Sequence, residues 1–177
     1  MNIFAIDEHP VRAARQMVDK HVVKMILEAG QMLSTSHRVL DGEEYYDRTK
    51  NNRRIKRWRL SDEREDKLWK ASFVNHPCTQ WTMESRMNYR WHATHALALC
   101  REYTHRYEKI HNSQALIEYL FNREPLNIRE GGLTKFAVAM PDQYKVECSV
   151  ESYRNYYRGE KAYFAKWKNR DTPVWWE

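Results

Sequence analysis

The sequence predicts an all-α fold: a compact single domain of about four helices with long irregular loops, over residues 1–177. Gly and Pro are scarce, with five of each in 177 residues, which argues against an all-β fold. Hydrophobic residues make up 42% of the chain, enough to build a core. Two long stretches repeat apolar residues at helical spacing, and a chain of this length fits one domain.

The first predicted helix runs from Pro10 to about Leu40. Asp7 can cap it, and Pro10 suits its first turn. We expect one broad apolar flank to be buried, and a second apolar flank to be formed by Val23 and Leu27. The residues of the first flank are Val22, Met25, Ile26, Ala29, Met32 and Leu33.

A narrow polar stripe runs along this helix between the two flanks. Its members are His21, Lys24, Glu28, Gln31, Thr35 and Arg38. Because a helix turns about 100° per residue, all six fall in one arc roughly 100° wide. Such a stripe between apolar flanks indicates a groove, although a solvent-facing stripe of an ordinary amphipathic helix has the same pattern. Glu28 beside a cation can act as a general acid or base. Lys24 can pair with it, bind a phosphate or serve as an amine nucleophile.

The helical pattern stops at residues 43–61, where we expect an inserted basic loop or a short basic helix. Residues 48–59 contain no acid, and Trp58 interrupts a run of cations. The cations are Arg48, Lys50, Arg53, Arg54, Lys56, Arg57 and Arg59. One or two helical turns are expected over residues 62–71.

The remaining helices are predicted at residues 78–107, 114–121 and 149–166. Asn75-His76-Pro77 is a break that starts the first of these, and Ser113 is placed to cap the second. Residues 122–147 are expected to be irregular, and residues 169–177 form an aromatic tail.

The last predicted helix interleaves basic and aromatic residues. Its members and those that follow it are Tyr153, Arg154, Tyr156, Tyr157, Arg158, Lys161, Tyr163, Lys166, Trp167, Lys168 and Arg170. Arg and Lys neutralise phosphates, while Tyr and Trp stack on unpaired bases. A solvated helix whose aromatic residues fill the core would give the same pattern. The net charge of +6 favours an anionic partner, with nucleic acid first among the candidates.

The cysteine and histidine patterns favour packing over metal binding. Cys78, Cys100 and Cys148 are odd in number and form no C-x-x-C pair, so we expect reduced thiols that pack as small apolar side chains. His92 and His95 are three residues apart, as in some metal sites, but no acidic or cysteine partner stands at ligand spacing. We expect no metal and no cofactor. No signal peptide pattern and no run of about 18 apolar residues occurs, so we expect no membrane association.

Three segments resemble the phage endonuclease V type of pyrimidine-dimer DNA glycosylase and its bacterial relatives. Residues 19–28 present an Asp, a His two residues on, and Glu28 seven beyond that His. Asn75-His76-Pro77, leading into residues 89–107, is similar to a segment of the bacterial relatives. Residues 155–163 resemble the aromatic, basic segment near the end of family members. The chain also resembles uncharacterised proteins of large phage genomes.

The resemblance implies an all-α fold packed around the first helix. It also implies an enzyme that cleaves the N-glycosidic bond of UV-linked pyrimidines and then breaks the strand at the abasic site. In that family the chain's own α-amino group attacks the sugar C1′ and forms a Schiff base, without a cofactor. Glu28 would be the essential carboxylate, and His21 would lie close to the damaged strand. Tyr156, Tyr157 and Lys161 would lie near the DNA.

The candidate site follows from these patterns together. The predicted catalytic residues are Glu28, His21, Lys24, Met1 and Asn2. The predicted DNA contacts are Arg53, Arg54, Lys56, Arg57, Arg59, Tyr156, Tyr157, Arg158 and Lys161. Further pocket candidates are Gln31, Asn75, His76 and His92.

The chain departs from the family pattern at three places, one of which is the extra segment at residues 43–61. The family nucleophile is a small residue exposed by removal of the initiator Met, whereas Asn2 follows Met1 here. The amine would then be that of Met1. Leu27 stands where the family has an Arg. These departures leave open that the chain acts on another damaged or modified base.

Two alternatives remain open at this point. A non-catalytic nucleic-acid-binding protein, such as a phage accessory or counter-defence factor, needs only the basic segments. A nucleotide- or base-modifying enzyme could use Lys24 and Glu28 on a small substrate, but no Gly-rich phosphate loop supports it. We expect a monomer that binds damaged or modified double-stranded DNA in the cytoplasm, or the host cytoplasm if a phage encodes it.

Overall fold

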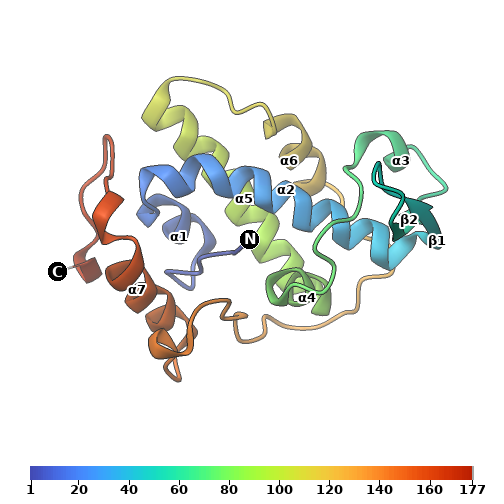
Figure 1. Ribbon diagram of the computed structural model, residues 1–177. Helices are drawn as coiled ribbons and strands as arrows, with labels where there is room; N and C mark the ends of the chain where they lie inside the picture. The colour runs from blue at the N-terminus through green and yellow to red at the C-terminus, as the bar shows by residue number, and fades with distance from the viewer. Residues whose placement is uncertain (177) are drawn as a thin grey trace.

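The structure, a computed structural model, describes residues 1–176 and is mostly helical (Figure 1). Within these residues the chain forms seven α-helices and a two-stranded antiparallel sheet. The prediction of an all-α fold with about four helices is therefore wrong. The elements are α1 Pro10–Gln16, α2 Asp19–Asp41, β1 Glu43–Arg48, β2 Arg54–Arg59, α3 Arg64–Lys67, α4 Pro77–Glu84, α5 Arg86–Tyr107, α6 Gln114–Phe121 and α7 Ser149–Glu160.

The core forms where α2 crosses α5, with α1 and α6 packed on α5 (Figure 1). The predicted first flank of α2 is buried throughout, and each of its side chains larger than Ala29 contributes roughly 1.5–3 kcal/mol through burial. The second flank is apolar but not buried, since Val23 and Leu27 are 40% and 45% exposed. The helix therefore buries one side and leaves the other open beside its polar stripe.

The first predicted helix is broken into α1 and α2 at Met17 and Val18, which are extended and fully buried. The cause lies on α5, where the guanidinium of Arg106 has no exposed surface. It donates hydrogen bonds of 2.8 Å to the carbonyl of Met17 and 2.9 Å to that of Arg15, and it pairs with Asp19. Carbonyls inside a continuous helix would already be occupied, so the buried guanidinium requires the break.

The second predicted long helix is likewise two helices, α4 and α5, because Ser85 is extended. Its hydroxyl accepts a 3.1 Å hydrogen bond from the backbone N–H of Asn88, the usual role of Ser before a helix. The predicted helix at residues 114–121 is confirmed as α6. The last helix ends at Glu160 rather than Lys166, and a 3₁₀ turn follows over Ala162–Phe164.

The expected basic loop or helix is instead a β-hairpin. Tyr and Trp favour strands, and the side chains alternate between exposed and half-buried positions. The strands pair from Glu43 opposite Arg59 to Arg48 opposite Arg54. Asn52 closes the turn with φ of 58°, a left-handed conformation that Asn tolerates better than most residues.

Glu108 ends α5 in a left-handed conformation that glycine adopts without strain, with φ of 56° and ψ of 31°. Its carboxylate also stands at the negative end of the helix dipole. We expect Glu108→Gly to raise the free energy of unfolding by about 0.5–1 kcal/mol, measured by urea denaturation. Glu108→Ala keeps the Cβ and should gain less; an equal gain would contradict a conformational origin.

The three cysteines are not all buried. Cys78 and Cys100 are buried free thiols, as expected, whereas Cys148 is exposed at the start of α7, so its assignment to the core is wrong.

None of the helices in residues 1–176 combines the length and the apolar character that a transmembrane helix requires.

Candidate functional site

The side chain of Glu28 on α2 meets the beginning of the chain. Glu28 is 7% exposed, and its Oε2 lies 3.6 Å from the α-amino nitrogen of Met1. The same oxygen accepts a 3.0 Å hydrogen bond from the backbone N–H of Asn2. Oε1 lies 3.1 Å from the Nζ of Lys24, one turn earlier on the helix. One carboxylate therefore holds an amine, an amide and an ammonium around it.

The first residues are fixed by the side chain of Asn2. Its Oδ1 accepts hydrogen bonds from the backbone N–H groups of Ile3 and Phe4, at 2.8 and 3.1 Å. Its Nδ2 donates to the carbonyl of Ala139 at 2.8 Å. Phe4 is buried with φ of 43°, a left-handed conformation that costs a non-glycine residue roughly 1–3 kcal/mol. The surrounding structure thus bends the chain so that its amine meets Glu28.

His21 lies on the same stripe of α2 but contacts other groups. Its Nδ1 is 2.7 Å from the hydroxyl of Tyr157 on α7, and its ring stacks on Phe4 with centroids 4.2 Å apart. Burial, together with the charges of Lys161 and Lys24, lowers the pKa of His21 to about 3. The imidazole is therefore neutral near pH 7 and joins α2, α7 and the N-terminal segment.

His76 stands close enough to the amine to be influenced by its charge. The ring nitrogen caps α4 by accepting the backbone N–H of Cys78 at 3.2 Å. Burial lowers the pKa of His76, the charge of the terminal ammonium lowers it further, and Glu28 opposes both. Asn75, exposed, precedes it, and Gln31 on α2 is half-buried.

The other members of the polar stripe bind further segments of the chain. The hydroxyl of Thr35 bonds with the backbone N–H and carbonyl of Ser72, at 3.0 and 3.1 Å. Arg38, 3% exposed, donates to the carbonyls of Trp58 and Trp69 at 3.1 and 2.7 Å. The stripe therefore does not face solvent as a whole, because only Lys24 among its six side chains is exposed.

Some of the predicted DNA contacts are exposed, and others already make hydrogen bonds within the protein. Arg53, Arg54, Lys56 and Arg59 on the hairpin are exposed. The half-buried Arg57 donates to the carbonyl of Ala71 at 3.0 Å.

The predicted contacts on α7 divide in the same way. Tyr157 is fully buried against His21, whereas Tyr156 is half-buried and Lys161 lies over its ring, 4.6 Å from the centroid. Arg158 donates to the carbonyl of Trp175 at 3.1 and 2.6 Å, from its Nε and Nη2.

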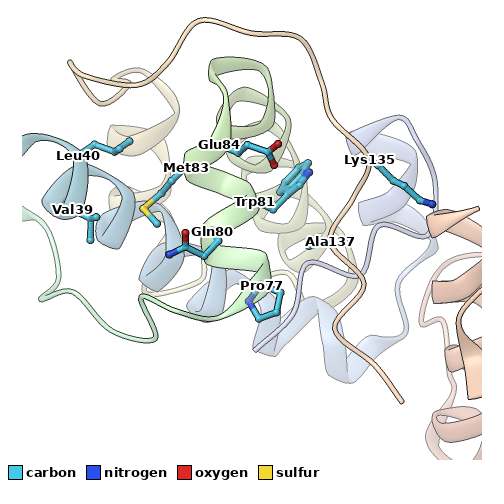
Figure 2. Close-up of a pocket in the computed structure, with 9 residues that line it drawn as sticks. All are labelled: Val39, Leu40, Pro77, Gln80, Trp81, Met83, Glu84, Lys135 and Ala137. Atoms are coloured by element: carbon cyan, nitrogen blue, oxygen red, sulfur yellow. The ribbon is translucent and has the colours of Figure 1, made fainter. Parts of the chain in front are cut away.

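A cavity of about 640 Å³ opens between α2, α4 and the segment after α6 (Figure 2). Its lining does not include the amine or Glu28. The lining residues are Val39, Leu40, Pro77, Gln80, Trp81, Met83, Glu84, Lys135 and Ala137. The reactive groups thus lie outside this cavity, beside the exposed flank of α2.

His92 and His95 lie inside the protein rather than at the amine. His92 is 1% exposed, and its Nδ1 is 2.8 Å from the hydroxyl of Thr82. His95 stacks on Trp91, with ring centroids 5.0 Å apart. Burial lowers the pKa of each to about 3, and burial lowers that of His37 to about 4.

We expect these histidines to make the protein acid-sensitive. His21, His37, His92 and His95 stay neutral when folded but bind protons below about pH 6.5 when unfolded. Their stabilising contribution is complete above that pH and is lost as the pH falls towards 4. Each can lower the free energy of unfolding by up to about 1.4 kcal/mol per pH unit. Urea unfolding at pH 7.5, 6.5 and 5.5 measures how the free energy of unfolding depends on pH. His95→Gln should reduce this slope by the contribution of one bound proton. A free energy of unfolding that is the same at all three pH values would contradict the burial of the histidines.

Comparison with known proteins identifies the first two thirds of the chain. A family model described as pyrimidine dimer DNA glycosylase matches residues 1–116 of 177. The match covers the N-terminal segment, α2, the hairpin and α5, and it ends before α7. No curated protein and no solved structure gives a significant match.

Proposed function

The chain belongs to the pyrimidine dimer DNA glycosylase family, and from this premise we propose that it also breaks the DNA strand through a Schiff base on its own α-amino group. The observation that carries the proposal is the 3.6 Å separation between the Met1 nitrogen and Oε2 of Glu28. An amine nucleophile needs a group that takes its proton and stabilises the cation formed at the sugar. Glu28 is the group beside it.

The proposed reaction uses only groups that the protein, the DNA and water supply. The neutral amine attacks C1′ of the damaged nucleotide, the bond from C1′ to the base breaks, and the base leaves with the bonding electrons and takes up a proton. The attached nitrogen then gives up one proton, and the sugar ring opens at the bond between C1′ and O4′. O4′ takes the bonding electrons and a proton, which leaves a protonated imine between C1′ and the amine. Loss of a C2′ proton expels the 3′ phosphate, and water finally releases the amine.

Glu28 serves these steps as a proton acceptor and as a negative charge. Its Oε2 can accept the proton that the terminal ammonium must lose before attack. The carboxylate also faces the sugar as positive charge develops there, in a site where water is largely excluded. An α-amino group holds its proton less tightly than a lysine side chain does, which favours the terminus over Lys24 as nucleophile. Lys24, 65% exposed, would instead bind a phosphate.

The chemistry does not depend on whether the initiator residue is removed. With Met1 present, the terminal amine is 3.6 Å from Glu28; without it, the nitrogen of Asn2 would be the amine, and it lies 3.0 Å away. The exposed hairpin cations, with Tyr156 and Lys161, would contribute phosphate and base contacts. His21 would act by holding the N-terminal segment rather than by touching the DNA.

Borohydride trapping tests the proposal. The protein is incubated with duplex DNA that carries an abasic site or a cyclobutane pyrimidine dimer, and the imine is reduced. We expect a covalent adduct on both substrates that maps by mass spectrometry to the N-terminal residue. An adduct on Lys24 would overturn the assignment of the nucleophile. An adduct on the abasic duplex alone would retain the lyase and exclude the dimer as the substrate of the glycosylase step.

A variant extended by two N-terminal residues is the matched control. Its α-amino group can no longer lie against Glu28, while every side chain is kept. We expect it to bind the abasic duplex and to form no adduct.

A further inference from the structure

We propose that the β1–β2 hairpin is a second DNA-binding element, which contacts phosphates of the duplex on one side of the reacting nucleotide, several base pairs away. The proposal rests on the proposed function for the position of that nucleotide. It adds a partner surface that the amine and Glu28 do not form.

The hairpin concentrates the positive charge of the molecule. Residues 43–59 contain seven basic and three acidic side chains, so this segment carries +4 of the net charge of +6. Glu43 and Glu44 lie at the base, where Glu44 pairs with Lys56 at 3.0 Å, whereas Asp47 directly precedes the tip. Arg48, Arg53 and Arg54 lie at the tip with Lys50, all exposed and with no acid between them. Such a cluster suits the phosphates of a nucleic acid.

The arrangement of cations is unfavourable for the sheet itself. Arg48 and Arg54 stand directly opposite each other in the strand register, and like charges at such a pair weaken a hairpin. The guanidinium of Arg54 stacks on the ring of Tyr46, 3.5 Å from its centroid, which holds it extended on the surface. A bound phosphate would turn this repulsion into attraction on both sides.

The base of the hairpin is held by two buried guanidiniums. Isolated two-stranded hairpins are at best marginally stable in water. Here Arg38 donates to the carbonyl of Trp58 in β2, and Arg64, 3% exposed, pairs with Asp41 at the end of α2 and with Asp62 just after β2. The charged tip therefore projects from a fixed base.

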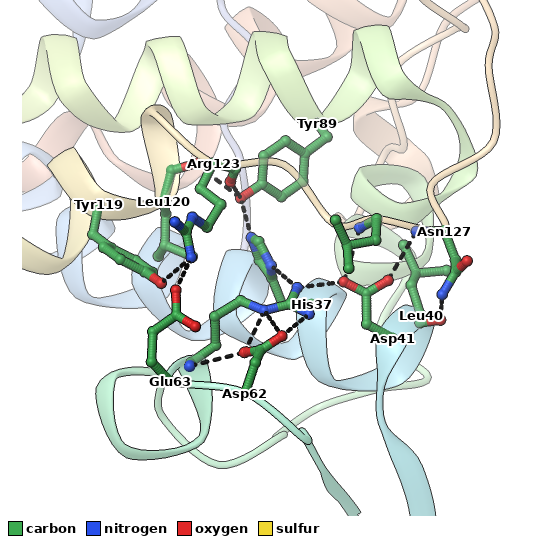
Figure 3. A network of polar contacts seen from close by, with 12 residues as sticks. His37, Leu40, Asp41, Asp62, Glu63, Tyr89, Tyr119, Leu120, Arg123 and Asn127 are labelled. Atoms are coloured by element: carbon green, nitrogen blue, oxygen red, sulfur yellow. Dashed lines mark hydrogen bonds and ion pairs between the residues drawn. The ribbon is translucent and has the colours of Figure 1, made fainter.

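A polar network continues from this base into the core. His37 lies between Tyr89 and the carboxylates of Asp41 and Asp62 (Figure 3). Its Nε2 is 2.8 Å from the hydroxyl of Tyr89, which donates to the carbonyl of Leu120 at 3.0 Å. The orientation of the hairpin relative to α2 is thus set by contacts with α5 and the end of α6.

Helix α2 sets the distance between Glu28 and the base of the hairpin. Glu28 and Asp41 are thirteen residues apart on one helix, which corresponds to about 20 Å. Base pairs rise by about 3.4 Å, so this distance spans roughly six base pairs. The N-terminus lies beside the middle of α2, the hairpin lies beyond its C-terminal end, and α7 lies towards the opposite end (Figure 1). A duplex along α2 meets the hairpin on one flank only.

Binding to trimmed duplexes tests the proposal. A stable abasic analogue is placed in a duplex with twelve base pairs on each side, and either flank is then shortened in steps. We expect the affinity of the unaltered protein to fall when one flank becomes shorter than about six base pairs. Arg48→Gln with Arg54→Gln should abolish the response to that flank and keep the response to the other. Equal responses of both proteins to both flanks would overturn the proposal.

The salt dependence gives an independent readout with a matched control. Loss of two phosphate contacts should make the plot of log affinity against log salt shallower by about two, and weaken binding about tenfold or more near 0.15 M salt. Arg101→Gln with Lys109→Gln removes the same charge from exposed positions at the end of α5. An equal change in this control would show a bulk charge effect and overturn the hairpin assignment.

Two further measurements separate this proposal from the chemistry. Arg48→Gln with Arg54→Gln should not lower the melting temperature, because it removes a like-charge pair, and its cleavage defect should lie in the DNA concentration that gives the half-maximal rate. Glu28→Gln should show the reverse, with flank dependence retained and cleavage lost. Failure of the proposed chemistry would appear in the cleavage assay alone, and failure of the hairpin proposal in the flank and salt assays alone.

Discussion

Replacement of Glu28 by Gln is expected to slow strand cleavage at an abasic site by about 10²–10⁴-fold, because the amine loses its proton acceptor and the developing cation loses its counter-charge. The amide is close in size to the carboxylate, and its oxygen can still accept from the backbone of Asn2. Duplex affinity should therefore change little. Single-turnover cleavage and borohydride trapping, each at saturating DNA, measure the effect.

Lys24→Gln is the matched comparison for this prediction. It removes the ammonium from Oε1 of Glu28 but leaves the amine at Oε2. We expect weaker DNA binding and a much smaller loss of cleavage at saturation. If Glu28→Gln cleaved abasic DNA at an unchanged rate, the carboxylate would have no part in the chemistry.

Replacement of Arg64 by Met is expected to lower the free energy of unfolding by about 3–5 kcal/mol. The side chains of Arg64 and Asp41 are 4% and 2% exposed, so the change leaves a buried carboxylate without its cation. It also removes the hydrogen-bond partner of the Nδ1 of His37, 3.0 Å away. Urea denaturation followed by circular dichroism gives the difference directly.

Substitution of Asp41 provides the control for Arg64→Met. Asp41→Asn in the Arg64→Met background should recover part of the loss, since no uncompensated charge then remains at that position. Arg90→Met breaks an ion pair with Glu124 at a residue that is 53% exposed, and should cost no more than about 1 kcal/mol. If Arg64→Met and Arg90→Met lowered the free energy of unfolding equally, burial would have no part in the effect.

Local periodicity predicted the parts of the fold that depend on local chemistry. The buried flank of α2 and the whole of α6 follow from helical spacing, and the polar stripe that meets the N-terminus could be seen in the same way. The helical predictions succeeded because each rests on residues that are neighbours along one helix. The family resemblance pointed to Glu28 and the terminal amine, which lie 3.6 Å apart, and their catalytic roles stay predictions.

The features that sequence reasoning missed depend on contacts between distant segments. The break at Met17 follows from Arg106, which lies almost ninety residues later, and no local signal marks it. The position of the amine depends on a hydrogen bond from Asn2 to the backbone of Ala139. The sequence predicts a DNA contact at Tyr157 because an aromatic side chain suits both packing in a protein core and stacking on a DNA base. Only the burial of Tyr157 distinguishes these two roles.

The hairpin was missed for a different reason. Its apolar residues do not alternate in the sequence, because Tyr45 and Tyr46 are adjacent and Ile55 and Trp58 are three residues apart. One half-buried position is the charged Arg57. Only the preference of Tyr, Ile and Trp for strands indicated the hairpin.

The stripe on α2 ties together pieces of chain that are otherwise remote: the N-terminus through Glu28, α7 through His21, the backbone at Ser72 through Thr35 and the hairpin through Arg38. The reactive geometry is thus a product of the completed fold and of no single fragment. On heating, the capacity to trap an abasic aldehyde should disappear in the same transition as the tertiary structure. A partly melted molecule would carry an ordinary amine, with no carboxylate to direct it.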